Sequence, residues 1–273
     1  MVLSLRFKTP APVPLEVEGL TPKHLRSKSL AEIERSTIFQ GNRKVPLGDY
    51  FRASGDPSDG VVHWEGDLAG VHWIGAKMTE GEIRVIGNAG RHIGSEMQGG
   101  RIVVEGDASD WVGGELKGGL IHVQGRAGHL IGAAYRGSAR GMSGGTILVN
   151  GDVGNEIGHT MRRGMLAVGG NTGDLIGFNM LAGSVLTFGE TGIRHGAGMH
   201  RGTLGFFGTT APPLLPTFCH ACRYRPEIMR LTFAYLRRIG FPMPDELSEM
   251  EVDLYHGDMI EGGRGEILIR AAP

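Results

Sequence analysis

The apolar positions of residues 60–208 recur with a period of 19 residues. Most rows fit this period without gaps, the first row has two extra residues, and the fourth fits if seven residues around 135–141 are an insertion. Each row opens with glycine and then alternates apolar residues with others, as at Ile83 and Val85. Because successive strand side chains point to opposite faces, this alternation predicts a strand with one buried face in every row. The fixed period predicts a repeat architecture.

Two further apolar columns follow within each row, separated by glycines. The first is aliphatic and the second is mostly methionine: Ile93, Val112, Ile131, Ile157 and Ile176, then Met78, Met97, Leu116, Met142, Met161, Met180 and Met199. Glycine suits the corners between three short sides, because it tolerates left-handed or crowded backbone. We therefore predict a mainly β fold, a right-handed parallel β-helix of about seven 19-residue coils over 60–208. The methionines are expected to be core fillers and not a soft-metal site.

The flanking segments are predicted to cap the coil, because stacked repeats gain stability only from their neighbours. Residues 1–59 predict an α/β N-terminal cap. It contains a strand over 2–8, a helix start at Thr21-Pro22, and a capping-box pattern from Ser29 to Glu32.

Residues 209–273 predict a C-terminal extension with a helix at about 226–239 and two short strands. One face of this helix is expected to carry its apolar residues, Ile228, Leu231, Tyr235 and Ile239. The extension is too short for a sizeable core of its own, so we expect it to pack on the coil or on a neighbour.

Composition narrows the functional classes. The net charge of −1 argues against a nucleic-acid partner held by bulk electrostatics. No apolar run approaches the roughly 20 residues of a membrane span, and the N-terminus lacks the pattern of a signal peptide. The two cysteines make no disulfide framework. A cytoplasmic protein without membrane or nucleic-acid partners is the expectation.

The candidate chemistry is sparse. Cys219 and Cys222 form one CxxC pair without a second, which favours ordinary thiols over half of a metal site or a redox pair. His195 replaces an aliphatic residue in an inward column, where a buried histidine held by backbone groups is the favoured interpretation. Gly-Asp pairs resemble calcium-binding repeats, but the nine-residue period is missing. The residues alone predict a rigid scaffold or interaction subunit, without a catalytic or metal site.

The row pattern resembles the glycine-rich coil shared by glutamate synthase and the C subunit of formylmethanofuran dehydrogenases. Residues 29–51 (SLAEIERSTIFQGNRKVPLGDYF), 141–170 and the tail from FCHACRYRPEIMR onward resemble the second family. The resemblance spans nearly the whole chain. It implies the C subunit of the formyltransferase/hydrolase complex of methylotrophic bacteria, which the excess of Arg over Lys favours, or that of a molybdenum or tungsten dehydrogenase of methanogens.

The bacterial complex transfers a formyl group from formyl-tetrahydromethanopterin to a methanofuran-type carrier and releases formate. The resemblance implies an amidohydrolase-like subunit, a formyltransferase subunit and a further subunit as partners. The active sites lie on those partners, so we expect no catalytic residue and no bound cofactor on this chain. A stand-alone β-helix acyltransferase is the lower-ranked alternative. As a hypothesis, Arg136, Arg140, Arg162 and Arg163 attract an anionic, glutamate-rich carrier or a partner.

Overall fold

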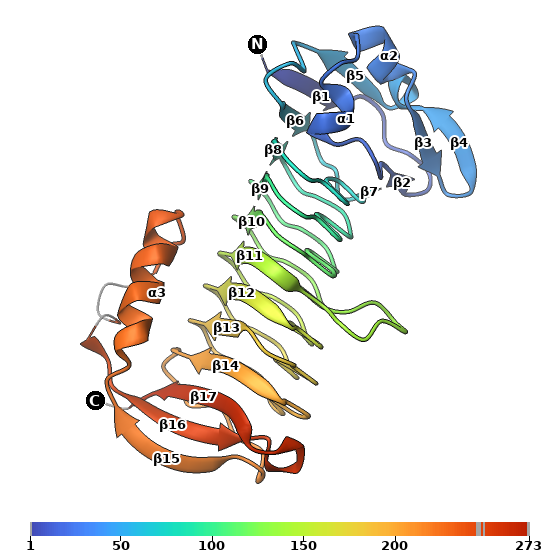
Figure 1. Ribbon diagram of the computed structural model, residues 1–273. Helices are drawn as coiled ribbons and strands as arrows, with labels where there is room; N and C mark the ends of the chain where they lie inside the picture. The colour runs from blue at the N-terminus through green and yellow to red at the C-terminus, as the bar shows by residue number, and fades with distance from the viewer. Residues whose placement is uncertain (1, 244–246, 248, 272–273) are drawn as a thin grey trace.

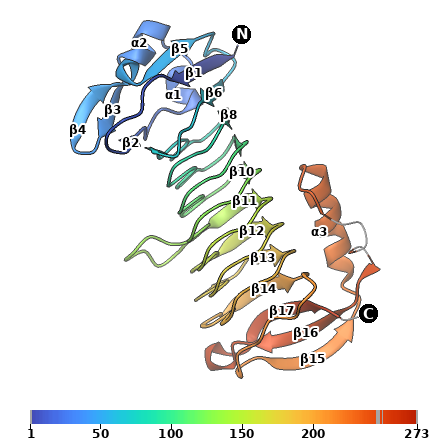
Figure 2. The same ribbon diagram turned by 180° about the vertical axis from the view of Figure 1, so that it is seen from behind.

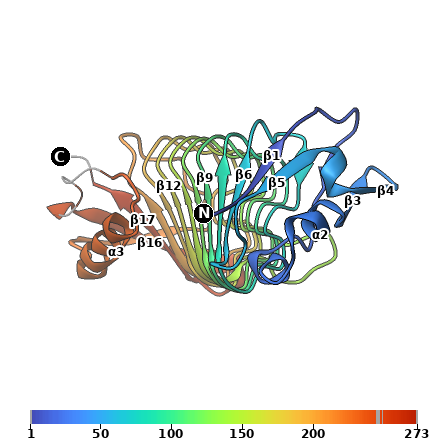
Figure 3. The ribbon, with the colours of Figure 1, turned by 90° about the horizontal axis from the view of Figure 1, so that it is seen from above.

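The computed structural model describes residues 2–243, 247 and 249–271, and it is mainly β. One thirteen-stranded sheet runs the length of the molecule, and a four-stranded sheet lies at its N-terminal end (Figure 1). The same long sheet is seen from behind in Figure 2. Viewed from above, the rows of the middle segment lie over one another, with the two terminal segments on opposite sides (Figure 3).

The middle of the long sheet consists of one strand from each row. These strands are β6 (Val61–Glu65), β8 (Glu82–Ile86), β9 (Arg101–Val104), β10 (Leu120–Val123), β11 (Ser143–Val149), β12 (Arg163–Val168), β13 (Ser184–Thr187) and β14 (Arg201–Phe206). All are paired in parallel, and Ile83 lies opposite Ile102, one 19-residue row later. Across the insertion Ile121 lies opposite Ile147, so the register resumes after the extra residues. The predicted row alignment and the observed register agree.

All three apolar columns point into the coil. Each methionine or leucine of the third column has no exposed surface, and neither does any of the five aliphatic residues of the second. Between them the backbone turns through alternating left-handed residues, such as Trp73, Gly75 and Lys77 with φ of 67°, 71° and 58°. A Cβ added at Gly75 would lie 2.4 Å from Cδ1 of Ile102, so this corner requires glycine for space as well as for conformation.

The N-terminal cap joins the long sheet directly. Its elements are β1 (Leu3–Phe7), β2 (Leu15–Glu16), α1 (Pro22–Leu25), α2 (Leu30–Glu34), β3 (Thr37–Gln40), β4 (Arg43–Pro46) and β5 (Phe51–Ser54). Strand β1 pairs in parallel with β6 and antiparallel with β5, while β2 pairs with the short β7 (Val71–His72) of the first row. The Ser29–Glu32 capping box is present at the start of α2. The first row is therefore covered by strands and not left as an open end.

The C-terminal extension closes the other end. It contains β15 (Cys219–Tyr224), α3 (Glu227–Arg238), β16 (Val252–Gly257) and β17 (Arg264–Arg270), and the sequence pattern did not predict β15. Strand β17 continues the parallel ladder beyond β14, with Leu204 opposite Ile267. Strands β16 and β15 then add in antiparallel order. The extension packs on the coil, as expected.

The apolar face predicted for the helix is wrong in part. Helix α3 packs through Met229, Phe233 and Leu236 against the outer face of the sheet, whose contacts are Leu148, Ala167, Leu186 and Phe207. Ile228 and Leu231 point away from the sheet, with 61% and 70% of their surface exposed, whereas Ile239 is partly buried and Tyr235 is half-buried. The helix has apolar residues on two sides, and the side that carries Phe233 is the one packed against the sheet.

Polar side chains satisfy the backbone of the next row at two corners. In one column the Oδ1 atoms of Asn88, Asp107, Asp152 and Asn171 accept hydrogen bonds from backbone N–H groups one row later. A second column does the same through His72, Asp110, His129, Asn155 and Asp174. The Gly-Asp pairs that resemble calcium repeats therefore have a structural role, because a buried or crowded N–H group needs an acceptor.

His195 is fully buried, as expected, and backbone groups hold both ring nitrogens. Its Nδ1 accepts a hydrogen bond from the Ile176 N–H group at 3.3 Å, and its Nε2 lies 2.9 Å from the Gly192 carbonyl oxygen and donates to it. Burial lowers the pKa of His195 to about 4. The ring is neutral at neutral pH.

Asp107→Ala should lower the free energy of unfolding by about 1 kcal/mol, because the Arg126 N–H group loses its acceptor at 2.8 Å. Asp107→Asn should cost much less, because an amide oxygen serves the same purpose at Asn88 and Asn171. Urea unfolding of the two variants measures this difference. Equal losses would show that charge, and not the acceptor, stabilises this corner.

Acidification should destabilise the protein in part through His195. Its pKa is about 4 when folded and 6.5 as the reference value, so only the unfolded chain gains a proton as the pH falls through this window. The full effect corresponds to roughly 3 kcal/mol, absent above pH 6.5 and complete below about 4. His195→Leu, which restores the aliphatic column, should reduce the slope of unfolding free energy against pH. An unchanged slope would contradict this assignment.

Candidate functional site

Three arginines gather at one corner of the coil, where the chain enters β12 and β14. Arg162, Arg163 and Arg201, with Leu181 and Ala182 between them, line a groove of about 390 Å³. We call this set of three arginines the arginine corner. The rows hold them together because Arg163 and Arg201 occupy the last position of two rows that are separated by one row. The groove is open to solvent and basic.

The charge of the arginine corner is uncompensated. None of its three side chains makes an ion pair with another described residue, and all three are exposed. Arg264 of β17 lies opposite Arg201 in the parallel ladder, which adds a fourth positive charge. Glu261, three residues before Arg264, lies 3.2 Å from His200, and Glu266 accepts a hydrogen bond from the Thr203 hydroxyl. Like charges at this spacing repel, so the corner favours a bound anion or an acidic partner surface.

The insertion between β10 and β11 is anchored at its first residue. The Tyr135 hydroxyl lies 2.6 Å from Oγ of Ser95 and 3.0 Å from Nδ1 of His92, and its ring stacks on Trp111 at 4.7 Å. The remainder of the loop projects from the coil (Figure 1) and carries Arg136 and Arg140, both exposed. The loop ends beside the row of the arginine corner, because the Gly141 N–H group donates to the Thr160 carbonyl oxygen at 2.9 Å.

The Ser95–Tyr135–His92 chain of hydrogen bonds is structural. Burial lowers the pKa of His92 to about 4 and raises the pKa of Tyr135 to about 12, so neither group exchanges a proton readily near neutral pH. Ser95 has no exposed surface, so a substrate cannot reach its hydroxyl group. The cluster holds the insertion in place. It is extended by Trp73, which stacks on His92 at 4.1 Å.

The CxxC pair lies on β15, the last strand of the long sheet, and both thiols are free and exposed. A register shift between His220 and Cys222 places Cys219 opposite His256 and Cys222 opposite Leu254. Both cysteines therefore lie on the same face of the sheet. In the part of the chain that the structure describes, no three His, Cys, Asp or Glu side chains form a group that could hold a metal ion.

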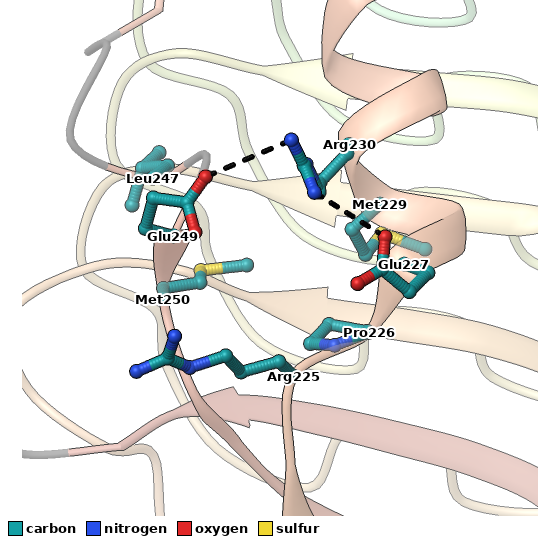
Figure 4. Close-up of a pocket in the computed structure, with 8 residues that line it drawn as sticks. All are labelled: Arg225, Pro226, Glu227, Met229, Arg230, Leu247, Glu249 and Met250. Atoms are coloured by element: carbon teal, nitrogen blue, oxygen red, sulfur yellow. Dashed lines mark hydrogen bonds and ion pairs between the residues drawn. The ribbon is translucent and has the colours of Figure 1, made fainter.

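A smaller crevice lies between the start of α3 and the residues Leu247, Glu249 and Met250 (Figure 4). Arg230 bridges it, at 3.4 Å from Glu227 and 3.8 Å from Glu249. Its volume of about 20 Å³ is comparable with the space for one water molecule, so it is not a ligand site. Among the described residues, no helix combines the length and the apolar character that crossing a membrane requires.

The structure therefore brings two of the four proposed arginines, Arg162 and Arg163, into one groove. Arg136 and Arg140 lie on the projecting loop and do not line it. The sequence pattern alone did not lead to Arg201 and Arg264. The row alignment contained the signal for Arg201, because it ends its row as Arg163 does. Arg264 carried no such signal, since β17 joins the ladder from outside the repeat.

In the comparisons with known proteins, the similar proteins are C subunits of two related enzyme complexes. No protein-family model matches the chain. The C subunit of the tungsten-containing formylmethanofuran dehydrogenase 2 of Methanothermobacter marburgensis is 40% identical over 85 residues, 30% of this chain and 32% of that protein. The C subunit of the formyltransferase/hydrolase complex of Methylorubrum extorquens is 34% identical over 90 residues, 33% of this chain and 34% of that protein. The chain thus spans about a third of the length of these curated relatives.

A solved structure extends the similarity to the whole chain. A chain of the formyltransferase/hydrolase complex (FhcABCD) from Methylorubrum extorquens, crystallised in complex with methylofuran, matches with a TM-score of 0.88. The match has 31% sequence identity and covers 98% of this chain and 100% of that chain. The chain therefore belongs to the family of the C subunit of the formyltransferase/hydrolase complex, which is homologous to the C subunit of formylmethanofuran dehydrogenase.

Proposed function

We propose that this chain is the non-catalytic scaffold subunit of a formyltransferase/hydrolase complex. The observation that carries the proposal is the end-to-end similarity to one chain of such a complex. In this role it holds an amidohydrolase-like subunit, a formyltransferase subunit and a further subunit in fixed positions. The complex transfers formyl from formyl-tetrahydromethanopterin to a methanofuran-type carrier and releases formate, and a tethered carrier gains from the high effective concentration that fixed positions provide.

The build of the coil suits a scaffold. We propose that residues 60–208 form a right-handed parallel β-helix, in which every row is hydrogen-bonded to both neighbours. The side chains of the apolar columns are buried inside the coil, and strands of both terminal segments extend the same sheet. Such a rod resists bending, because any bend would open close-packed contacts in several rows together. Subunits bound at different rows would keep their separation.

The arginine corner and the projecting loop are proposed to contact the carrier or an acidic partner segment. A glutamate-rich carrier presents carboxylates in series, and guanidinium groups bind carboxylates well through paired hydrogen bonds. Arg162 and Arg163 contribute two of the groups in the groove, and Arg136 and Arg140 stand on the adjacent loop.

A second candidate function is that of the C subunit in a molybdenum- or tungsten-containing formylmethanofuran dehydrogenase. The identity of 40% over 85 residues to the corresponding subunit of the tungsten-containing enzyme favours it. The full-length structural match favours the first proposal. Both place the chemistry on other subunits.

The purified native assembly distinguishes these functions. We expect the tagged chain, isolated from its own host, to carry amidohydrolase-like and formyltransferase subunits without a molybdopterin or tungstopterin centre. Native mass spectrometry and metal analysis give the composition. Bound molybdenum or tungsten with iron–sulfur clusters would transfer the assignment to the dehydrogenase. A chain that purifies alone would refute the scaffold role.

Removing the arginine corner should weaken binding of a glutamate oligomer by roughly tenfold in Arg162→Ala/Arg163→Ala/Arg201→Ala. Three exposed ion pairs at about 0.5 kcal/mol each account for this factor. Arg136→Ala/Arg140→Ala should have a smaller effect, because the loop arginines do not line the groove. Titration of the native assembly with a fluorescent oligoglutamate measures the dissociation constants, and added salt should weaken wild-type binding.

The matched control removes three exposed basic side chains from the N-terminal cap, in Arg43→Ala/Lys44→Ala/Arg52→Ala. This variant should bind as the wild type does. An equal loss in the control would mean that only net charge matters, and unchanged binding in the corner variant would exclude the groove.

A further inference from the structure

Helix α3 presents a second, unused side to solvent. Its inner side is covered by the sheet, and Phe233 meets Phe207 with ring centroids 5.4 Å apart. On the outer side Leu231 is 70% exposed and Ile228 is 61% exposed, beside an open hollow of about 680 Å³. The helix lies at the periphery of the molecule, on the side away from the N-terminal cap (Figure 3). Nothing in the described part of the chain covers this side.

The outer side carries a stripe that is symmetric about its own midpoint. Glu227, Leu231, Ala234 and Arg238 follow one another at intervals of four, three and four residues, the spacing of a helix–helix seam. A half-turn about the middle of the helix exchanges the two ends of the stripe, and it also exchanges Leu231 with Ala234. A large side chain then faces a small one, and an acid faces a base.

The end charges are available for such an exchange. The Glu227 side chain is 81% exposed and has only a long contact of 3.4 Å with Arg230 of its own helix. Arg238 rests over the ring of Tyr235 at 5.5 Å and makes no ion pair with any residue that the structure describes. A surface that presents opposite charges at its two ends is complementary to itself in antiparallel orientation.

We propose that the outer side of α3 docks a second copy of this chain, with the two helices antiparallel about a twofold axis. Glu227 of each copy pairs with Arg238 of the other, and Leu231 packs over Ala234 of the other. The self-complementary order of charge selects a second copy over an unrelated partner. The twofold joins two whole assemblies when the chain carries other subunits, so this interface is separate from the scaffold role.

The interface is small. A helix of 12 residues is about 18 Å long, so one face of it buries less area than a standard stable interface. The dimer should therefore depend on concentration. This is the behaviour that sedimentation and light scattering detect over the range of about 1 to 100 μM.

The test is a charge exchange in the full chain, together with any subunits that purify with it. Glu227→Arg and Arg238→Glu each place like charges opposite one another twice in the dimer, and each should raise the dissociation constant at least about tenfold. The double variant Glu227→Arg/Arg238→Glu restores opposite charges and should return dimerisation to within a few-fold of wild type. Analytical ultracentrifugation gives the constants, and circular dichroism at matched temperature verifies folding.

Restoration by the double variant is the expected result, because no effect on folding alone would reverse in this way. The proposal is overturned if wild type holds a single copy up to about 100 μM, or if single variants leave the constant unchanged. It is also overturned if the double variant is as weak as the single ones. Loss of another subunit in the single variants, at constant copy number, would assign this side of α3 to that subunit instead.

Discussion

Each inner row of the coil buries its three apolar columns against the rows before and after it, and the two terminal segments take the place of the missing neighbour at each end. A single row has no core, and its backbone N–H and C=O groups point along the axis towards its neighbours. The register of 19 residues both buries the apolar columns and pairs the backbone N–H and C=O groups of neighbouring rows. It brings Ile83 over Ile102, and it brings the methionines of successive rows into one column. The glycine corners, the polar columns and the two terminal segments all serve this register.

The sequence contained this constraint, which explains why the parallel strand of each row and its register could be predicted. The extra residues of the first and fourth rows fall outside the ladder without shifting it. The N-terminal capping box from Ser29 to Glu32 could also be predicted, because both of its residues lie within four positions of the sequence. Helix α3 was different, because apolar residues occur on two of its sides. Its packed side depends on Phe207 and Leu186, which are distant in sequence, and helical periodicity alone selected residues that are partly exposed.

The candidate site, too, could be predicted only where its residues follow from local sequence or from the row alignment. Arg162 and Arg163 are adjacent in sequence, so their proximity could be predicted without knowledge of the fold. The contribution of Arg201 follows from the row alignment, whereas that of Arg264 depends on a strand that enters the sheet from the tail. Tyr135 marks the opposite case. Its role as the anchor of the insertion depends on Trp73, His92 and Trp111 of three earlier rows. These three residues are spaced by 19, so the row alignment places them in one column, but no spacing in the sequence places Tyr135 against them.

Strand β17 lies near the end of the chain, and yet it completes the ladder that the repeat begins. During synthesis the rows can form in order as they emerge, each one on the last. The edge of β14 stays open until Arg270 has been made, and the outer face over Leu148 and Phe207 stays bare until α3 arrives. A nascent chain of this protein therefore exposes a strand edge and an apolar face together until α3 has been translated, and the strand edge alone until β17 has been translated. This is the interval in which misassembly is most favoured.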